Sequence, residues 1–222
     1  MNTPGPSICE RCVRCPRIQG TINDFGAPHP QKYHTCRPLL LRQYWRGADK
    51  RPSESGIAYV GSTKEGLSFY VYMQDSDIFS RVKAEDETMW MLGDVVEFFV
   101  KPGNHRSDYW EIHITPNDFM MDIDIPSRAS YMDGTVPWEQ VLAPSTHATK
   151  RVAVMDDKWA VELCIPWTAF RLEGPPPRGT VWQFAVCRYN YTGDLEDPEH
   201  SSTAHLTRVD FHRYEQYTKL IF

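Results

Sequence analysis

The segment Trp90–Val100 (WMLGDVVEFFV) places an aromatic ring a few residues ahead of a carboxylate, in a run that is typical of a β-strand. If the apolar residues beside Glu97 face a core, the two-residue repeat of a strand puts Glu97 on the opposite face. An indole ring can cover the apolar face of a pyranose while a carboxylate accepts hydrogen bonds from its hydroxyls. Trp90 and Glu97 are therefore candidates for sugar recognition. Taken alone, however, the pattern favours a structural interpretation, in which Trp90 covers the end of the core and Glu97 is a solvated strand residue.

A second polar stripe is expected on the segment Tyr109–Ile114 (YWEIHI), which alternates polar and apolar residues. Tyr109, Glu111 and His113 share one face of a strand, and the apolar residues between them are expected in the core. The stripe could donate and accept hydrogen bonds. His113 is also a candidate metal ligand, although a single histidine on a strand is more often an ordinary hydrogen-bonded side chain.

Three cysteines lie close together near the start of the chain, in the pattern C-x2-C-x2-C-P formed by Cys9, Cys12 and Cys15. Thiolates at this spacing can surround one zinc ion or an iron–sulfur cluster, with Cys36 as a distant fourth ligand. Because no second pair of cysteines is present, a reduced segment without metal is favoured. The spacing does not indicate a disulfide framework.

Carboxylates gather in several loops, among them Asp75 with Asp77. Loop carboxylates supply the oxygen ligands that calcium prefers, so Asp75 and Asp77 are candidate calcium ligands. No EF-hand spacing is present, and solvated loop charges would give the same pattern. The sequence also contains no G-x-S-x-G motif and no glycine-rich phosphate loop. No pair of carboxylates carries a sequence signal for the raised pKa that a glycosidase acid needs. These observations predict a protein that is not an enzyme.

The composition is that of a globular domain: 222 residues, 41% hydrophobic and 13% aromatic, with a net charge of −5. The charge argues against a nucleic-acid partner, which would need a basic face. No run approaches the roughly 20 apolar residues of a membrane span. The first twenty residues lack the apolar stretch of a secretory signal, which predicts a cytoplasmic protein as the sequence is written. A truncated start would instead allow an extracellular one.

Short apolar or alternating runs separated by turn residues recur from Gly56 onward and predict strands. At this spacing they indicate an all-β, antiparallel sandwich of the jelly-roll or immunoglobulin-like kind. The only helical stretch expected is one or two turns around Trp167–Phe170, directly after Pro166. Residues 1–45, rich in Cys, Pro and Arg, are expected to form an irregular N-terminal arm, and residues 46–222 the sandwich. The strands are expected at 57–61, 67–74, 95–100, 109–115, 119–125, 147–155, 159–165, 181–191 and 217–222.

From about Trp45 to Phe222, the order of features resembles the family 9 carbohydrate-binding modules. Each matching segment has low specificity by itself, but six of them occur in the family's order. They are FYVYMQDSDI (69–78), W-x3-DVVEFFVKPG (90–103), YWEIHITPNDFMMD (109–122), WAVELCIPWTAF (159–170), WQFAVCRYNY (182–191) and FHRYEQYTKLIF (211–222).

The resemblance implies a β-sandwich that binds mono- or oligosaccharides between aromatic rings with polar partners, and that sometimes holds structural calcium. Trp90 matches a stacking ring, Glu97 a carboxylate that holds hydroxyls, and His113 lies near a hydrogen-bonding basic residue. The second ring of the family's clamp follows the strand that contains Arg188. This loop has no Trp here, so Tyr191 is expected to replace it, with Arg188 and Asn190 as further hydrogen-bonding residues.

Two alternatives stay open at this point. The same broad sandwich resembles haem-binding DOMON domains, which use Met with His or Lys as axial ligands, and Met120, Met121 and His113 would be the candidates here. In the other alternative, the protein is an interaction subunit whose cysteine-rich arm carries a metal ion.

Overall fold

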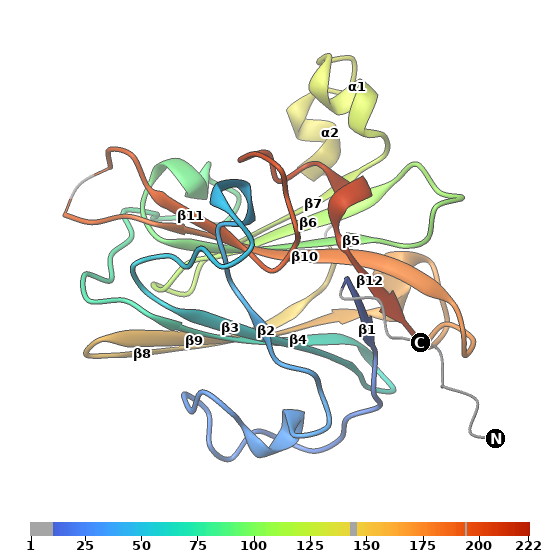
Figure 1. The fold of residues 1–222 in the computed structure, drawn as a ribbon. Coiled ribbons are helices and arrows are strands. Elements are labelled where there is room, and N and C mark those ends of the chain that lie inside the picture. The colour runs from blue at the N-terminus through green and yellow to red at the C-terminus, as the bar shows by residue number, and fades with distance from the viewer. Residues whose placement is uncertain (1–10, 143–145, 194) are drawn as a thin grey trace.

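Two β-sheets lie face to face in the computed structural model, which describes residues 11–142, 146–193 and 195–222 (Figure 1). Sheet A has the strand order β1-β12-β10-β5-β6-β7, with β11 beside β10, and sheet B has the order β2-β3-β4-β9-β8. All neighbouring strands are antiparallel except β1 and β12. The all-β antiparallel sandwich predicted from the sequence is confirmed.

The strands of sheet A are β1 (Cys12–Arg14), β5 (Val95–Lys101), β6 (Tyr109–Ile114), β7 (Met120–Ile125), β10 (Val181–Asn190), β11 (Glu199–Ser202) and β12 (Thr218–Ile221). Those of sheet B are β2 (Leu39–Leu40), β3 (Gly56–Ser62), β4 (Gly66–Gln74), β8 (Thr149–Met155) and β9 (Lys158–Pro166). Two short helices, α1 (Arg128–Met132) and α2 (Trp138–Leu142), stand above sheet A (Figure 1). The 3-10 turns are η1 (Gln31–Tyr33), η2 (Tyr44–Arg46), η3 (Met89–Met91), η4 (Trp167–Phe170) and η5 (Tyr214–Gln216).

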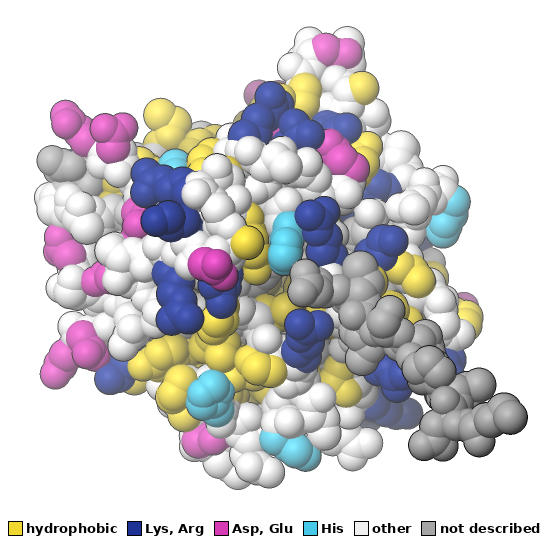
Figure 2. Space-filling view, viewed as in Figure 1, with side chains coloured by type: hydrophobic (Ala, Val, Ile, Leu, Met, Phe, Trp, Pro, Cys, Tyr) yellow, Lys and Arg dark blue, Asp and Glu magenta, His cyan; other side chains and the backbone are white. Residues whose placement is uncertain are grey.

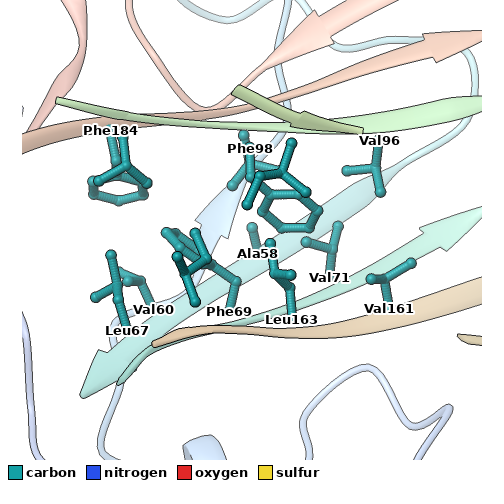
Figure 3. Packing of buried hydrophobic residues seen from close by; sticks show 14 of the residues in the cluster. Ala58, Val60, Leu67, Phe69, Val71, Val96, Phe98, Val161, Leu163 and Phe184 are labelled. Atoms are coloured by element: carbon teal, nitrogen blue, oxygen red, sulfur yellow. The ribbon is translucent and has the colours of Figure 1, made fainter. Parts of the chain in front are cut away.

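The main core lies between the two sheets and follows the two-residue repeat of the strands. From sheet A, Phe98 and Phe184 point down toward Phe69 and Leu163 of sheet B, and all four are fully buried (Figure 3). The rings of Phe69 and Phe98 lie 5.3 Å apart in a tilted arrangement. This alternation fixes the opposite set of side chains, which includes Glu97, on the outer face of sheet A.

The outer face of sheet A is itself covered, so strands β5 and β6 are buried on both faces. The second hydrophobic cluster on this face includes Phe99 of β5 and Met121 of β7, and the covering residues include Met89, Val141 and Phe211. Burial on both faces explains why β5 reads as an almost continuous apolar run with one carboxylate in it.

The segment before residue 45 is irregular over most of its length but contributes an edge strand to each sheet. Strand β1 pairs in parallel with β12, and β2 pairs with β3. Between them the chain crosses the outer face of sheet B (Figure 1), where Tyr33 and Ile18 pack in the third hydrophobic cluster with Tyr59 and Tyr70.

The predicted strands all lie within a few residues of observed ones, and the turn expected at Trp167–Phe170 is the 3-10 turn η4. The expectation that this is the only helical stretch is wrong, because α1 and α2 lie between β7 and β8. Each of these helices has five residues, so neither shows a helical repeat of apolar positions. The short strands β1, β2 and β11 likewise carry too few residues for a two-residue pattern. Within the described ranges, no helix is both long and apolar enough to span a membrane.

Charged side chains are interspersed on the face seen in Figure 2. Lys and Arg side chains lie across its middle, while acidic side chains lie mainly along one rim, and in this view the basic residues do not merge into one continuous patch.

Candidate functional site

A cavity of about 300 Å³ opens on the outer face of sheet A. Its floor comes from β5, β6 and β10, and its walls come from η3, α1 and the chain between β11 and η5. Aromatic and acidic side chains dominate the lining, which consists of Trp90, Glu97, Phe99, Glu111, Tyr131, Tyr189, Val209, Asp210, Phe211 and His212. Among the residues that the structure describes, no Lys or Arg lines it.

Two glutamates, Glu97 and Glu111, line the floor of this cavity, and the buried His113 contacts both of them; we call these three ionisable side chains the floor cluster. Glu97 and His113 are directly opposite each other in the β5–β6 register, and Glu111 precedes His113 by one strand repeat. The His113 Nε2 atom lies 2.6 Å from Glu111 Oε1 and 3.4 Å from Glu97 Oε1. The exposed fractions of the three residues are 2%, 5% and 0%, respectively. The alternation predicted for both strands therefore brings Glu97 and His113 together, as their candidate roles require.

Burial and mutual contacts shift the pKa of each member of the floor cluster. Burial, reinforced by the charge of Glu111 and opposed by His113, raises the pKa of Glu97 from 4.5 to about 8. Burial alone would lower the pKa of His113, but the two carboxylates raise it. The pKa of Glu111 is lowered, because His212 and His113 outweigh the effect of burial. The cluster therefore retains protons at neutral pH that these side chains would lose in the unfolded chain.

Hydrogen-bonding capacity is left over at the floor. Within the described part of the chain, the polar contact of Glu97 is the one with His113, whose Nε2 atom lies 3.4 Å from Glu97 Oε1. Glu111 Oε2 and His113 Nδ1 lack a partner there. Buried polar atoms are usually satisfied, so an unsatisfied group that faces a cavity indicates a place where a ligand or ordered water binds.

The aromatic walls are held by the surrounding chain. The half-buried Trp90 ring packs edge-on against His113, with centroids 5.4 Å apart, and against Trp138 of α2 at 6.2 Å. The Tyr191 hydroxyl donates to the Trp90 carbonyl at 2.5 Å, so Tyr191 holds the backbone of η3. Tyr189, two residues earlier, lines the cavity instead.

His212 extends the floor cluster from the loop before η5. Its Nδ1 atom is 2.8 Å from the Tyr109 hydroxyl and 3.8 Å from Glu111 Oε2. Sequence reasoning did not select His212, Tyr131 or Asp210, because each comes from an irregular or very short segment without a repeat. Tyr189 could have been selected, since it shares the face of β10 opposite to Phe184 and Val186.

Arg188 and Asn190 lie on the other side of β10 and are not brought together with Trp90 and Glu97. The alternation that directs Tyr189 to the cavity directs Arg188 and Asn190 to the end of the inter-sheet core. There Arg188 Nη2 donates to Asp75 Oδ2 at 2.9 Å and also to Asn190 Oδ1. The prediction that these two residues share a site with Trp90 is corrected accordingly.

The carboxylates of the predicted calcium ligands Asp75 and Asp77 accept hydrogen bonds from other groups of the protein. Asp75 is buried, and its Oδ2 atom also accepts a hydrogen bond from Trp159 Nε1 at 3.1 Å. Its Oδ1 atom accepts one from the Asp77 backbone at 3.1 Å. Asp77 Oδ2 accepts one from the Gly193 backbone at 2.5 Å. Calcium binding at this pair stays a prediction.

Of the predicted cysteine ligands, Cys9 lies outside the described residues, and Cys12 and Cys15 are buried. Burial raises the pKa of Cys15 to about 12, and burial also raises that of Cys36 to about 12. Both thiols are therefore protonated at neutral pH, whereas metal ligation needs thiolates. Metal binding by this segment stays a prediction.

The two methionines considered as haem ligands point to opposite faces of β7. Met121 is buried on the outer face opposite His113, and Met120 packs against the inter-sheet core. Since His113 Nε2 contacts Glu111, the geometry does not favour the haem alternative.

A larger cavity, of about 750 Å³, lies on the outer face of sheet B. No Phe, Tyr or Trp of the described part of the chain lines it, and two of its basic residues are already paired: Lys32 with Glu162 at 2.6 Å and Lys150 with Asp118 at 2.7 Å. We therefore assign the candidate site to the smaller cavity, which combines aromatic walls with unsatisfied buried acids.

No protein-family model matches the sequence, and no curated protein matches it. Solved structures do match. One, from Bacteroides uniformis, is described as a "putative carbohydrate-binding protein"; it is 14% identical, with a TM-score of 0.66 over 95% of this chain and 98% of its own. Two more are of a family 9 carbohydrate-binding module from Caldicellulosiruptor kristjanssonii. In complex with cellotriose it is 12% identical, with a TM-score of 0.63 over 94% and 92% of the two chains. In complex with glucose it is 10% identical, with a TM-score of 0.62 over 94% of each. The chain therefore has a β-sandwich fold like that of the family 9 carbohydrate-binding modules.

Proposed function

We propose that the cavity on the outer face of sheet A binds a carbohydrate and that the protein is not an enzyme. The observation that carries this proposal is a pair of buried carboxylates, Glu97 and Glu111, that lines an aromatic-walled cavity, with Glu111 Oε2 left without a hydrogen-bond partner among the described residues. The modules with the same fold that were solved with cellotriose and glucose support a sugar as the ligand class.

The chemistry of the lining matches that of a sugar. Hydroxyl groups of a pyranose can donate to Glu97, and the C–H face of its ring can pack on Trp90 or Tyr189. Each hydroxyl–protein hydrogen bond replaces one to water, so the expected affinity is modest.

The charges of the lining favour a neutral sugar. Glu97, Glu111 and Asp210 line the cavity, and no Lys or Arg of the described ranges does. A uronic or sulfated sugar would place its negative charge beside these carboxylates. The proposed ligand is therefore a neutral mono- or short oligosaccharide, and the volume of about 300 Å³ lies at the small end of the range for ligand pockets.

The arrangement of the two glutamates supports a binding role over hydrolysis. A glycosidase needs carboxyl groups on either side of the scissile bond. Here Glu97 and Glu111 lie side by side on the floor and contact the same His113 nitrogen. Binding without turnover of the sugar is the expected outcome.

The test is calorimetric titration of the purified protein with glucose, cellobiose, cellotriose and glucuronic acid. We expect saturable binding of at least one neutral sugar and weaker binding of the anionic one. Trp90→Ala should abolish measurable binding, while Phe25→Ala, which removes a half-buried ring on the sheet B side, should leave it unchanged. Equal binding by the Trp90→Ala variant would overturn the placement of the site, and absence of binding to every sugar would overturn the proposed function.

A further inference from the structure

The floor cluster has the composition of a metal site. Among the described residues, one group of three or more metal-ligating side chains brings its ligand atoms within 4.8 Å of one another, and this group is Glu97, Glu111 and His113. Two carboxylates and one imidazole form a mixed oxygen and nitrogen donor set. Zinc and neighbouring transition metals use such sets, whereas calcium requires six to eight oxygens.

The distances suit a small ion. Ligand atoms about 2.0–2.1 Å from a tetrahedral ion lie about 3.4 Å from one another. His113 Nε2 is 3.4 Å from Glu97 Oε1, and it is 2.6 Å from Glu111 Oε1. The first distance fits without change, and the second needs a movement of less than about 1 Å, which rotation of the Glu111 side chain can supply.

Two further observations point to a missing cationic ligand. Glu111 Oε2 is buried, belongs to a residue that lines the cavity, and has no hydrogen-bond partner in the described part of the chain. The basic side chains that contact the two glutamates are His113 and His212, and among the described residues no Lys or Arg lines the cavity. A buried carboxylate is stable when a counter-charge or a metal ion neutralises it, and a divalent ion would neutralise both.

We propose that Glu97, Glu111 and His113 form a binding site for a divalent transition-metal ion of the zinc class at the floor of the cavity. Three protein ligands leave a fourth position for water or for a bound ligand, as in zinc sites that are open on one side. This site goes beyond the proposed sugar binding and does not depend on it, although the two share Glu97.

The test uses the 222-residue chain after removal of metal with a chelator, titrated with Co²⁺ as a spectroscopic probe and then with Zn²⁺. We expect one saturable Co²⁺ site with the visible absorption of a four-coordinate ion, displaced by Zn²⁺. A near-ultraviolet thiolate-to-cobalt band would assign the ion to the cysteines instead and would overturn the proposal.

The variants locate the site. His113→Gln and Glu111→Gln should each weaken Co²⁺ binding about tenfold or more, since even the partners of metal ligands contribute this much. His34→Gln removes an exposed histidine on the sheet B side and should bind as the wild type does. Circular dichroism checks that each variant is folded, and Glu97→Gln provides a third variant should either of the others unfold. Absence of a saturable Co²⁺ or Zn²⁺ site, or unchanged binding by the folded ligand variants, would overturn the inference.

Parallel sugar titrations separate this inference from the proposed function. Sugar binding by a protein that takes up neither Co²⁺ nor Zn²⁺ would overturn the metal site alone. Metal binding without binding of any sugar would support the metal site and overturn the carbohydrate proposal.

Discussion

Two buried groups of charged residues lie on opposite faces of sheet A and differ in how their hydrogen bonds are met. The floor cluster of Glu97, Glu111 and His113 faces the cavity on the outer side. The other group, which we call the sandwich-end network, consists of Glu54, Asp75, Arg188 and Asn190 at the end of the inter-sheet core. Arg188 and Asn190 come from β10, which alternates as β5 and β6 do, whereas Glu54 precedes β3 and Asp75 follows β4. Both groups combine carboxylates with a basic side chain, so their residue types alone do not distinguish them.

In the sandwich-end network, the carboxylates of Asp75 and Glu54 accept hydrogen bonds from other groups of the protein. Arg188 donates to Asp75 and, through Nη1, to the Gln74 carbonyl at 2.8 Å. Asn190 Nδ2 donates to Glu54 Oε2 at 3.0 Å, and Ser76 donates to Glu54 Oε1 from both its backbone and its hydroxyl. The guanidinium Nε of Arg188 is the atom of this network without a partner among the described residues.

The floor cluster has no cation comparable to Arg188 and keeps unsatisfied oxygens toward a cavity. A network that satisfies itself holds the fold together, whereas one that does not is available to a ligand. The contrast predicts that substitutions in the sandwich-end network reduce stability, and that substitutions around the floor cluster reduce binding.

The largest effect is expected for Arg188→Met. Removal of the guanidinium leaves Asp75 buried without its counter-charge, which should lower the free energy of unfolding by about 3–5 kcal/mol. Urea denaturation followed by tryptophan fluorescence measures this change. A loss below about 1 kcal/mol would show that water reaches Asp75 and that the sandwich-end network is not the structural element inferred here.

A smaller effect, on binding, is expected for Trp90→Ala. Loss of a central aromatic contact costs about 2 kcal/mol in an interface, which corresponds to a roughly 30-fold rise in the Kd for sugar. Trp90 is half-buried in η3, outside the strands, so the urea midpoint should change much less than in Arg188→Met. Equal losses of stability in the two variants would remove the distinction between the two regions.

The pH dependence of stability should arise largely at the floor cluster. The pKa of Glu97 is raised from 4.5 to about 8, mainly by burial, and that of His113 is raised by the two carboxylates. The folded protein therefore binds more protons than the unfolded chain at neutral pH, and stability is lost as the pH rises toward about 8. We expect the free energy of unfolding to fall by about 1 kcal/mol per pH unit between pH 6 and 8.

A matched variant identifies the source of this slope. Glu97→Gln should reduce the slope of the free energy of unfolding against pH. Some slope should remain near pH 7, because burial and Asp75 raise the pKa of Asp94 to about 7. An unchanged slope in Glu97→Gln would assign the pH dependence to Asp94 and its neighbours instead.

Sequence reasoning predicted the sandwich because long strands repeat a pattern. Alternation around Phe98 and Ile112 correctly assigned one face of β5 and of β6 to the core, and so placed Glu97 and His113 on the other face. The same rule separates Tyr189 from Arg188 on β10, whereas the family resemblance groups Arg188 and Asn190 with Trp90.

The walls of the cavity could not be predicted in this way. Tyr131 and His212 come from a five-residue helix and an irregular loop, so no local repeat indicates which way they face. Their positions depend on how these segments pack on sheet A, which is a property of the whole chain. The hydrogen bonds of Asp75 also join distant segments, because Trp159 and Arg188 both reach it across the sandwich.

The smallest effect is expected for Glu97→Gln, and it compares the two regions most directly when Glu54→Gln is measured beside it. A hydrogen bond to a charged acceptor contributes about 1 kcal/mol more than one to a neutral acceptor. Above pH 8, where Glu97 is ionised, Glu97→Gln should therefore weaken sugar binding about fivefold to tenfold. The free energy of unfolding at pH 8 should stay the same or rise, because an unsatisfied buried charge is removed. Glu54→Gln should do the reverse: it weakens the hydrogen bonds from Ser76 and Asn190, lowering stability while leaving sugar affinity unchanged. Calorimetry and urea denaturation of the same two preparations measure both quantities, and a stability loss in Glu97→Gln as large as in Glu54→Gln would show that Glu97 holds the fold together rather than facing a ligand.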